Sequence, residues 1–111
     1  MAVDDKELLK EFVLRKSDQA FGQIVHRYAD LIYASALRQV READLAQEVA
    51  QAAFIVLARR ASSVQAEHLP GWLLGTARLC AEDGLKKQAR RSHHDHCRNH
   101  EAHSVTTRLT G

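Results

Sequence analysis

Apolar residues recur with helical spacing in four separate stretches of this sequence. The first covers residues 4–15, and the second keeps one apolar face throughout residues 18–41. The third and fourth cover residues 44–60 and 70–91. No stretch alternates in the manner of a half-buried strand, so the pattern predicts an all-α protein, a compact bundle of about four helices.

Residues that favour helix ends separate these stretches. Asp4 suits the start of the first helix, and Ser17 or Asp18 is expected to cap the second. Pro70 suits the first turn of the fourth helix, because the N–H that it lacks would have no intrahelical partner there. Residues 61–68 are polar and are expected to form a loop between the third and fourth helices.

Helical periodicity disappears at Ser92, and five of the seven histidines follow it. We expect residues 1–91 to form one helical domain and residues 92–111 a disordered, histidine-rich tail or the start of a linker. His93, Cys97 and His100 have a spacing that zinc can use, but histidine-rich tails more often bind metals loosely or not at all. They are weak metal candidates, and no cofactor is predicted.

The composition indicates a cytoplasmic protein. No apolar run approaches the roughly 20 residues that span a bilayer, so no membrane span is expected, and the N-terminus lacks the features of a secretory signal. The two cysteines lie in unlike contexts that do not suggest a disulfide framework, and Cys80 is expected to be a small core residue.

Charge is unevenly distributed along the chain, whose formal net charge is +2. Residues 1–75 contain nine Lys/Arg and ten Asp/Glu, whereas residues 76–111 contain seven and four. If a polyanion binds this chain, we expect it at the C-terminal part, but charge alone favours an ordinary solvated surface.

Catalysis finds little support in the sequence. It has no glycine-rich phosphate loop and no serine in a nucleophile-elbow setting. Glu82 and Asp83 are adjacent on a predicted helix and face different sides, so they do not form a catalytic pair. The chain is not expected to be an enzyme.

Three segments resemble, in order, one protein family. They are Ala-Phe-Gly-Gln-Ile-Val-His-Arg-Tyr at 20–28, Leu-Ala-Gln-Glu-Val-Ala-Gln-Ala-Ala-Phe-Ile-Val-Leu at 45–57, and the segment at 71–87 that begins Gly-Trp-Leu-Leu-Gly-Thr-Ala-Arg and ends Asp-Gly-Leu-Lys-Lys. Together they are similar to the core-binding, promoter-melting domain, region 2, of extracytoplasmic-function sigma factors of bacterial RNA polymerase. The resemblance covers most of residues 17–91.

The chain departs from the family pattern in three respects. Ala52 stands where the family usually has an acid, and Leu79 where it usually has an asparagine on the presumed DNA side. Family members also carry a second helical domain that reads the upstream promoter element, and 111 residues leave no room for one. We expect either one domain cut from a longer factor or a naturally short form.

The resemblance implies that the third helix docks on the clamp helices of core RNA polymerase. Acidic and amide side chains at spacings of three and four share one side of this helix. Such spacing alone is more typical of ordinary surface residues, and it is the resemblance that favours docking. The candidate polymerase-binding residues are Asp44, Gln47, Glu48 and Gln51.

The resemblance also implies that the fourth helix and the loop before it bind and melt promoter DNA. The cationic candidates for phosphate contacts are Arg78, Lys86, Lys87, Arg90 and Arg91, which could equally complement the helix dipole. The candidates for receiving an unstacked base are Ser62, Ser63, Gln65 and His68, for which a plain connecting loop is the alternative. Trp72 is expected to pack in the core, and Asp83 to pair with an arginine inside the bundle.

These inferences predict a sigma factor domain that binds core RNA polymerase and recognises and melts the downstream (−10) promoter element. An anti-sigma factor is expected as a further partner. Two alternatives stay open: a sigma-like decoy that captures an anti-sigma factor without starting transcription, and a metal-binding helical protein unrelated to transcription.

Overall fold

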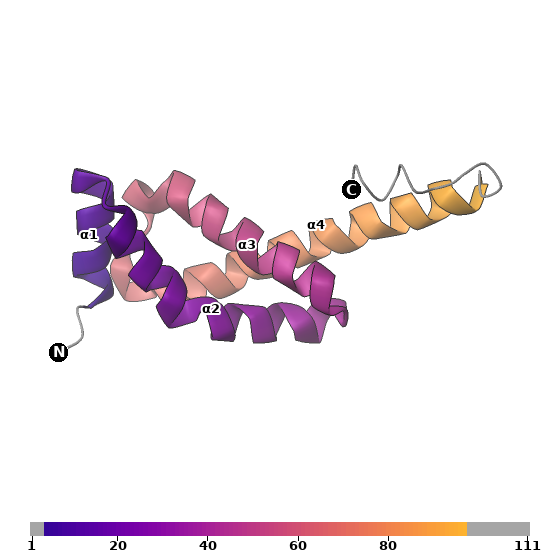
Figure 1. Ribbon diagram of the computed structural model, residues 1–111, viewed down its shortest axis with the longest axis horizontal. Helices are drawn as coiled ribbons and strands as arrows, with labels where there is room; N and C mark the ends of the chain where they lie inside the picture. The colour runs from indigo at the N-terminus through magenta and orange to yellow at the C-terminus, as the bar shows by residue number, and fades with distance from the viewer. Residues whose placement is uncertain (1–3, 98–111) are drawn as a thin grey trace. The chain divides into compact units, whose positions relative to one another are not determined.

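The computed structural model describes residues 4–97, with side chains through Arg91, and all its elements are helical (Figure 1). The α-helices are α1 (Asp5–Arg15), α2 (Asp18–Val40), α3 (Ala43–Arg60) and α4 (Leu69–Cys97). Two short 3-10 helices, η1 (Ala61–Ser63) and η2 (Ala66–His68), connect α3 to α4. The described residues contain no strand, and the prediction of an all-α protein with four helices is confirmed.

The first two helices begin and end with side-chain caps and left-handed residues. The Asp4 carboxylate accepts a hydrogen bond from the Glu7 N–H at 2.9 Å, and the Ser17 hydroxyl accepts one from the Ala20 N–H at 3.1 Å. Asp4 was one of two acids expected at the start of the first helix, and Ser17 was one of two residues expected to cap the second. The helices end at Lys16 and Arg41, with φ of 53° and 60°, where the left-handed backbone turns the chain into the next helix.

Two boundaries differ from the sequence-based expectation. The segment predicted as a loop contains η1 and η2, because Ala61 and Val64 pack on the core and hold the chain close to it. α4 begins at Leu69 and continues beyond Arg91 to Cys97. A polar segment can extend an existing helix because propagation costs far less free energy than nucleation. The rest of the predicted tail, 98–111, lies outside the described residues.

By its contacts the chain divides into two units whose boundary falls within α4. Of the described residues, 4–81 belong to the first unit and 82–97 to the second. This boundary precedes the domain end predicted at residue 91. The first unit contains α1, α2, α3, both 3-10 helices and the beginning of α4, whereas the second consists of the remainder of α4.

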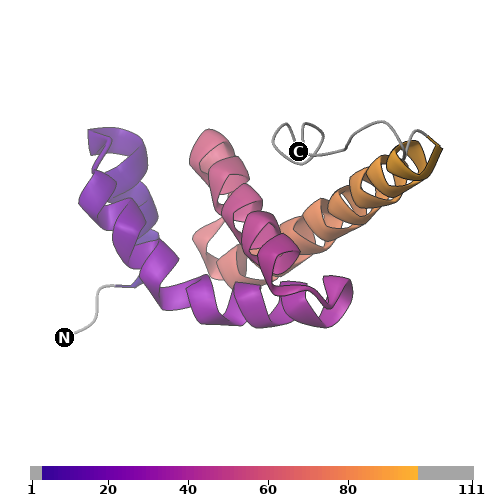
Figure 2. The same cartoon turned by 45° about the vertical axis from the view of Figure 1, so that its right-hand side comes forward.

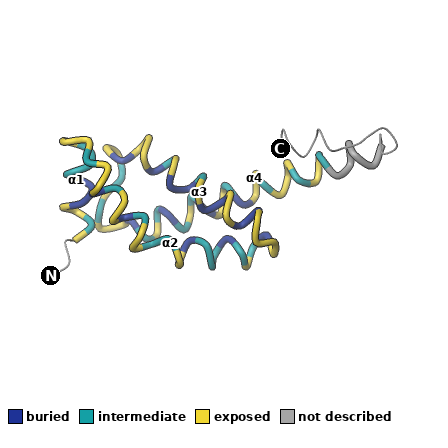
Figure 3. The backbone as a smooth tube through the Cα atoms, viewed as in Figure 1, coloured by how far each residue is buried: buried dark blue, intermediate teal, exposed yellow. Residues whose placement is uncertain are grey.

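The core of the first unit is apolar, and α3 contributes the largest share of it (Figure 3). α3 turns back from the end of α2 and packs on it more extensively than α1 does (Figure 2). The buried residues of α3 are Leu45, Ala46, Val49, Ala50, Ala53, Phe54 and Leu57. No described polar or charged residue is buried in this core, so its cohesion comes from apolar packing.

The first part of α4 completes this core. Leu69, Leu73 and Ala77 recur every four residues and are completely enclosed. Trp72 and Cys80 are half-buried and pack against the same cluster, as predicted for both. The start of α4 is therefore held by burial on one side.

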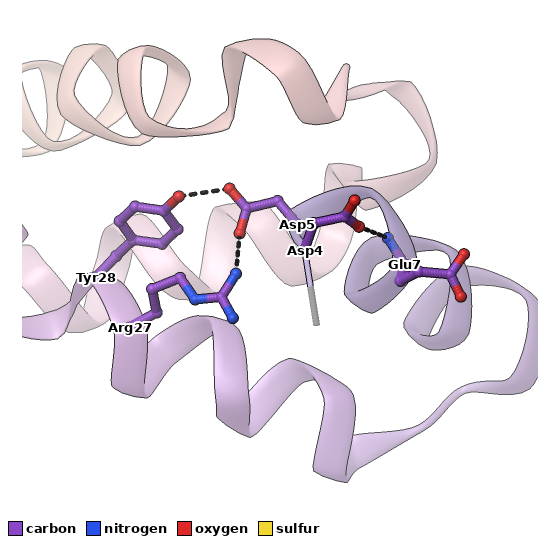
Figure 4. Close-up of polar contacts among 5 residues, drawn as sticks. All are labelled: Asp4, Asp5, Glu7, Arg27 and Tyr28. Carbon is purple, nitrogen blue, oxygen red and sulfur yellow. Dashed lines mark hydrogen bonds and ion pairs between the residues drawn. The ribbon is translucent and has the colours of Figure 1, made fainter. Parts of the chain in front are cut away.

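Asp5 links α1 to α2 through polar contacts (Figure 4). One carboxylate oxygen accepts a hydrogen bond from the Arg27 guanidinium at 2.7 Å, and the other accepts one from the Tyr28 hydroxyl. Burial raises the pKa of Tyr28 to about 12, and the hydrogen bond to Asp5 and the charge of Asp5 act in the same direction. The charge of Arg27 acts against them. The protonated hydroxyl is thus the form that the fold favours.

We expect this link to weaken at high pH. The pKa of a tyrosine in an unfolded chain is about 10, so Tyr28 makes its full contribution to the free energy of unfolding below that pH. It is lost as the pH rises towards about 12, the pKa of Tyr28 in the folded protein. Thermal unfolding midpoints between these two pH values should therefore fall more steeply for the wild type than for Tyr28→Phe. Parallel curves would contradict this assignment.

Candidate functional site

The four candidate polymerase-binding residues lie together on the exposed side of α3. Asp44, Gln47, Glu48 and Gln51 are all exposed, whereas the residues between them face the core. Spacings of three and four place them along one side of the helix. We call these four residues the acidic-amide face. It is opposite the buried side of α3, so a partner could cover it without disturbing the core.

Ile55 extends the acidic-amide face by one further turn. It is 53% exposed although it is a large apolar residue, and it follows Gln51 by four positions. Ile55 was not among the residues predicted from the sequence, although this spacing was a signal that could have found it. Protein interfaces combine an apolar centre with a polar surround, and Ile55 beside amide and acidic side chains provides both.

The four loop candidates are all exposed, but the structure constrains them unequally. Ser62 and Ser63 belong to η1, whereas Gln65 precedes η2 and His68 ends it. The Ser63 hydroxyl donates a hydrogen bond to the carbonyl of Arg60 at 3.0 Å at the end of α3. Its donor is therefore occupied, and Ser63 can offer a base only an acceptor. Ser62, Gln65 and His68 form no side-chain hydrogen bond within the described residues.

The cationic candidates fall into both units. Arg78 is exposed in the first unit. In the second unit, Lys86, Lys87 and Arg90 are exposed and Arg91 is half-buried. At about 100° of rotation per residue these four side chains span an arc of roughly 140° on the helix. The second unit therefore carries them on one side, not scattered around its circumference.

The full length of α4 tests whether these cations compensate the helix dipole. The helix dipole acts mainly within the last turn, but α4 continues to Cys97, beyond Arg91. Lys86, Lys87 and Arg90 therefore do not lie at the C-terminal end that the dipole explanation requires. Their position therefore argues against compensation of the helix dipole.

The predicted partner of Asp83 is wrong. Asp83 forms an ion pair with Lys87 at 3.1 Å, and both side chains are exposed, by 61% and 59%. The two residues are one helical turn apart, so the helix itself brings them together outside the bundle interior. An exposed pair of this kind contributes little to stability. A phosphate could compete with Asp83 for Lys87 at small cost.

The remaining expectations from the sequence concern metal binding and membrane spans. Residues of the described part of the chain form no group of His, Cys, Asp or Glu suited to a metal ion. The side chains of His93 and Cys97, and the whole of His100, lie outside the described residues. Within residues 4–97 no helix combines the length and the apolar character needed to cross a membrane.

Comparison with known protein families decides the family of this chain. The model of the sigma-70 region 2 family matches residues 24–91, more than half of the sequence. The chain belongs to the sigma-70 region 2 family. No match to it was found among curated proteins or among solved structures.

Membership of the sigma-70 region 2 family places the chain among transcription initiation proteins. The family consists of sigma factors, transcription initiation proteins that bind RNA polymerase and are not enzymes. The matched residues include the acidic-amide face, the loop candidates and the cations of α4. α1 and the start of α2 precede the matched residues.

We expect Arg90→Ala to reduce the salt dependence of DNA binding by this sigma-70 region 2 domain. Each phosphate contact that is lost should make the slope of log affinity against log salt shallower by about 0.7–0.9. Binding of a forked DNA would be measured by fluorescence anisotropy over a salt series. The matched control is Arg38→Ala, an exposed arginine near the end of α2 that is no candidate for DNA contact. Equal slopes for Arg90→Ala and the wild type would show that Arg90 makes no phosphate contact.

Proposed function

We propose that this chain is the region 2 domain of an extracytoplasmic-function sigma factor acting in the cytoplasm. It binds core RNA polymerase through α3 and recognises and melts the downstream promoter element with the η1–η2 segment and α4. One observation supports this most: the acidic-amide face and the buried side of α3 are opposite sides of a single helix.

The charge of α3 favours a cationic protein surface as its partner. Between Ala43 and Ala58 the helix carries the carboxylates of Asp44 and Glu48 and no cation. A partner with a complementary positive surface would associate with α3 faster and with higher specificity. Gln47 and Gln51 add hydrogen-bonding groups, and Ile55 adds an exposed apolar contact, so the face offers more than charge.

The η1–η2 segment and the cations of α4 suit opened DNA. Unstacking a base costs a few kcal/mol, which phosphate contacts must offset. Arg78 and the four cations of the second unit can supply such contacts, and Ser62, Gln65 and His68 offer hydrogen-bonding groups for base edges. The cations of α4 would thus supply affinity for DNA, and the polar residues of the η1–η2 segment would recognise the base.

Leu79 supports a second candidate function. It is 67% exposed and stands where the family pattern has a polar residue on the DNA side. An exposed leucine fits a protein surface better than a phosphate backbone, which favours a sigma-like decoy that binds an anti-sigma factor. An anti-sigma factor is also a partner of the domain under the first proposal.

We expect Glu48→Arg to abolish retention of core RNA polymerase in a pull-down with the 111-residue chain. The reversed charge would face a cationic surface, and like charges at an interface cost enough free energy to lower affinity by about tenfold or more. Because Glu48 is exposed, the free energy of unfolding should change by no more than about 0.5 kcal/mol. The matched control is Glu67→Arg, an exposed acid in η2 outside the acidic-amide face.

Two results would count against polymerase binding through α3. Equal recovery of polymerase by the wild type and Glu48→Arg would exclude the acidic-amide face as the docking surface. If the wild type retained an anti-sigma factor but no polymerase, the decoy function would replace the first proposal.

A further inference from the structure

α1 packs on the η1–η2 segment as well as on α2. Its contacts within the first unit extend to α2, η1 and η2, and Leu8 and Leu9 bury one side of the helix in the core. The η1–η2 segment carries the residues proposed to meet an opened base. α1 precedes the residues that match the sigma-70 region 2 family, so the match does not account for what α1 does at this segment.

The middle of the η1–η2 segment depends on its neighbours for support. No residue of η2 is buried, and neither 3-10 helix begins with a side-chain cap. The Val64 N–H donates to the carbonyl of Ala61 at 3.3 Å, and the His68 N–H donates to the carbonyl of Gln65 at 2.9 Å. Helices this short have little stability of their own. A shift of α1 would therefore move a surface on which the segment rests.

Asp5 fixes where α1 lies on α2. Burial of Leu8 and Leu9 has no preferred direction, so alone it would tolerate a small rotation or slide of α1. The two carboxylate oxygens of Asp5 accept hydrogen bonds from different residues of α2, Arg27 and Tyr28 (Figure 4). The Asp5 side chain is only 16% exposed, so water competes little for these bonds. Hydrogen bonds of a charged group to two donors in fixed places set both the rotation and the register of the helix.

The contact between α1 and α2 nearer the end of α1 is of a different kind. The rings of Phe12 and Phe21 lie with their centroids 4.7 Å apart and are tilted by 38°. Aromatic pairs are attracted over a range of offsets and angles, so this contact holds the two helices together without fixing their register. The register therefore depends on the polar contacts of Asp5.

We propose that Asp5 is a positioning residue for base recognition by the η1–η2 segment. By tying α1 to Arg27 and Tyr28, it holds the surface on which η1 and η2 rest, so that Gln65 and His68 are presented in one arrangement. Asp5 itself contacts neither DNA nor polymerase in this role. The cations of α4 and the acidic-amide face of α3 do not depend on the tie. The inference rests on the proposed function, because that function assigns base recognition to this segment.

NMR of the 111-residue chain tests the effect on the segment without DNA. Asp5→Ala should shift the backbone amides of residues 64–68 and accelerate their hydrogen exchange severalfold, and Tyr28→Phe, which removes one of the two bonds, should do so less. The matched control is Ala36→Gly, at a buried position of α2 about two turns beyond Tyr28. Asp5→Ala and Ala36→Gly should each lower the thermal unfolding midpoint by about 5 °C. Equal changes at residues 64–68 in these two variants, or none in Asp5→Ala, would overturn the proposal.

Forked DNAs that carry each of the four bases in turn at every unpaired position measure base preference. At a temperature where all variants are folded, the ratio of the highest to the lowest affinity should fall about threefold in Asp5→Ala, because the segment loses its single arrangement. The slope of log affinity against log salt should stay at the wild-type value, because the phosphate contacts of α4 are unchanged. Ala36→Gly should keep both the ratio and the slope. Fluorescence anisotropy measures both quantities.

The outcomes separate failure of this inference from failure of the proposed function. A wild-type chain without any base preference would remove base recognition by the η1–η2 segment, and the positioning role with it. A wild-type preference that Asp5→Ala retains in full, or that Ala36→Gly loses to the same extent, would overturn the positioning role alone. Asp5→Ala should also retain core RNA polymerase as the wild type does. Loss of polymerase would contradict a role confined to the η1–η2 segment.

Discussion

Seven residues of α3 are buried, and Ala46, Ala50 and Ala53 among them have side chains small enough to let a neighbouring helix approach closely. This packing fixes the rotation of α3 about its own axis. Once that rotation is fixed, Glu48 and Gln51 can only face outwards. The exposed side of the helix is thus a consequence of apolar burial, and a partner that binds there meets a rigid surface with little conformational entropy left to lose.

The same packing fixes both ends of the segment proposed to meet DNA. Ala61 is buried directly after α3, and Leu69 is completely enclosed at the start of α4. Between these anchors the chain forms two short 3-10 helices, with Val64 packed on the core. Polar side chains such as Ser62 and His68 are therefore exposed from a short, constrained connection, a suitable setting for recognition of a base.

Helices, their caps and the outward side of α3 could be predicted because each depends on residues close in sequence. Periodicity and capping at Ser17 are local signals of this kind. The contacts of Asp5 with Arg27 and Tyr28 join residues 22 and 23 positions apart, and nothing local marks them. The length of α4 was missed because its polar end has no apolar stripe, and Asp83 was given a distant partner although Lys87 lies one turn away.

Site-specific photo-crosslinking to core RNA polymerase tests most directly whether the exposed side of α3 is a docking surface. A crosslinking amino acid would replace Gln51 in one protein and Lys10, exposed on α1, in another. If this side of α3 docks on polymerase, we expect a strong crosslink to polymerase from position 51 and little or none from position 10. Crosslinks of equal yield from both positions, or a stronger one from position 10, would contradict it.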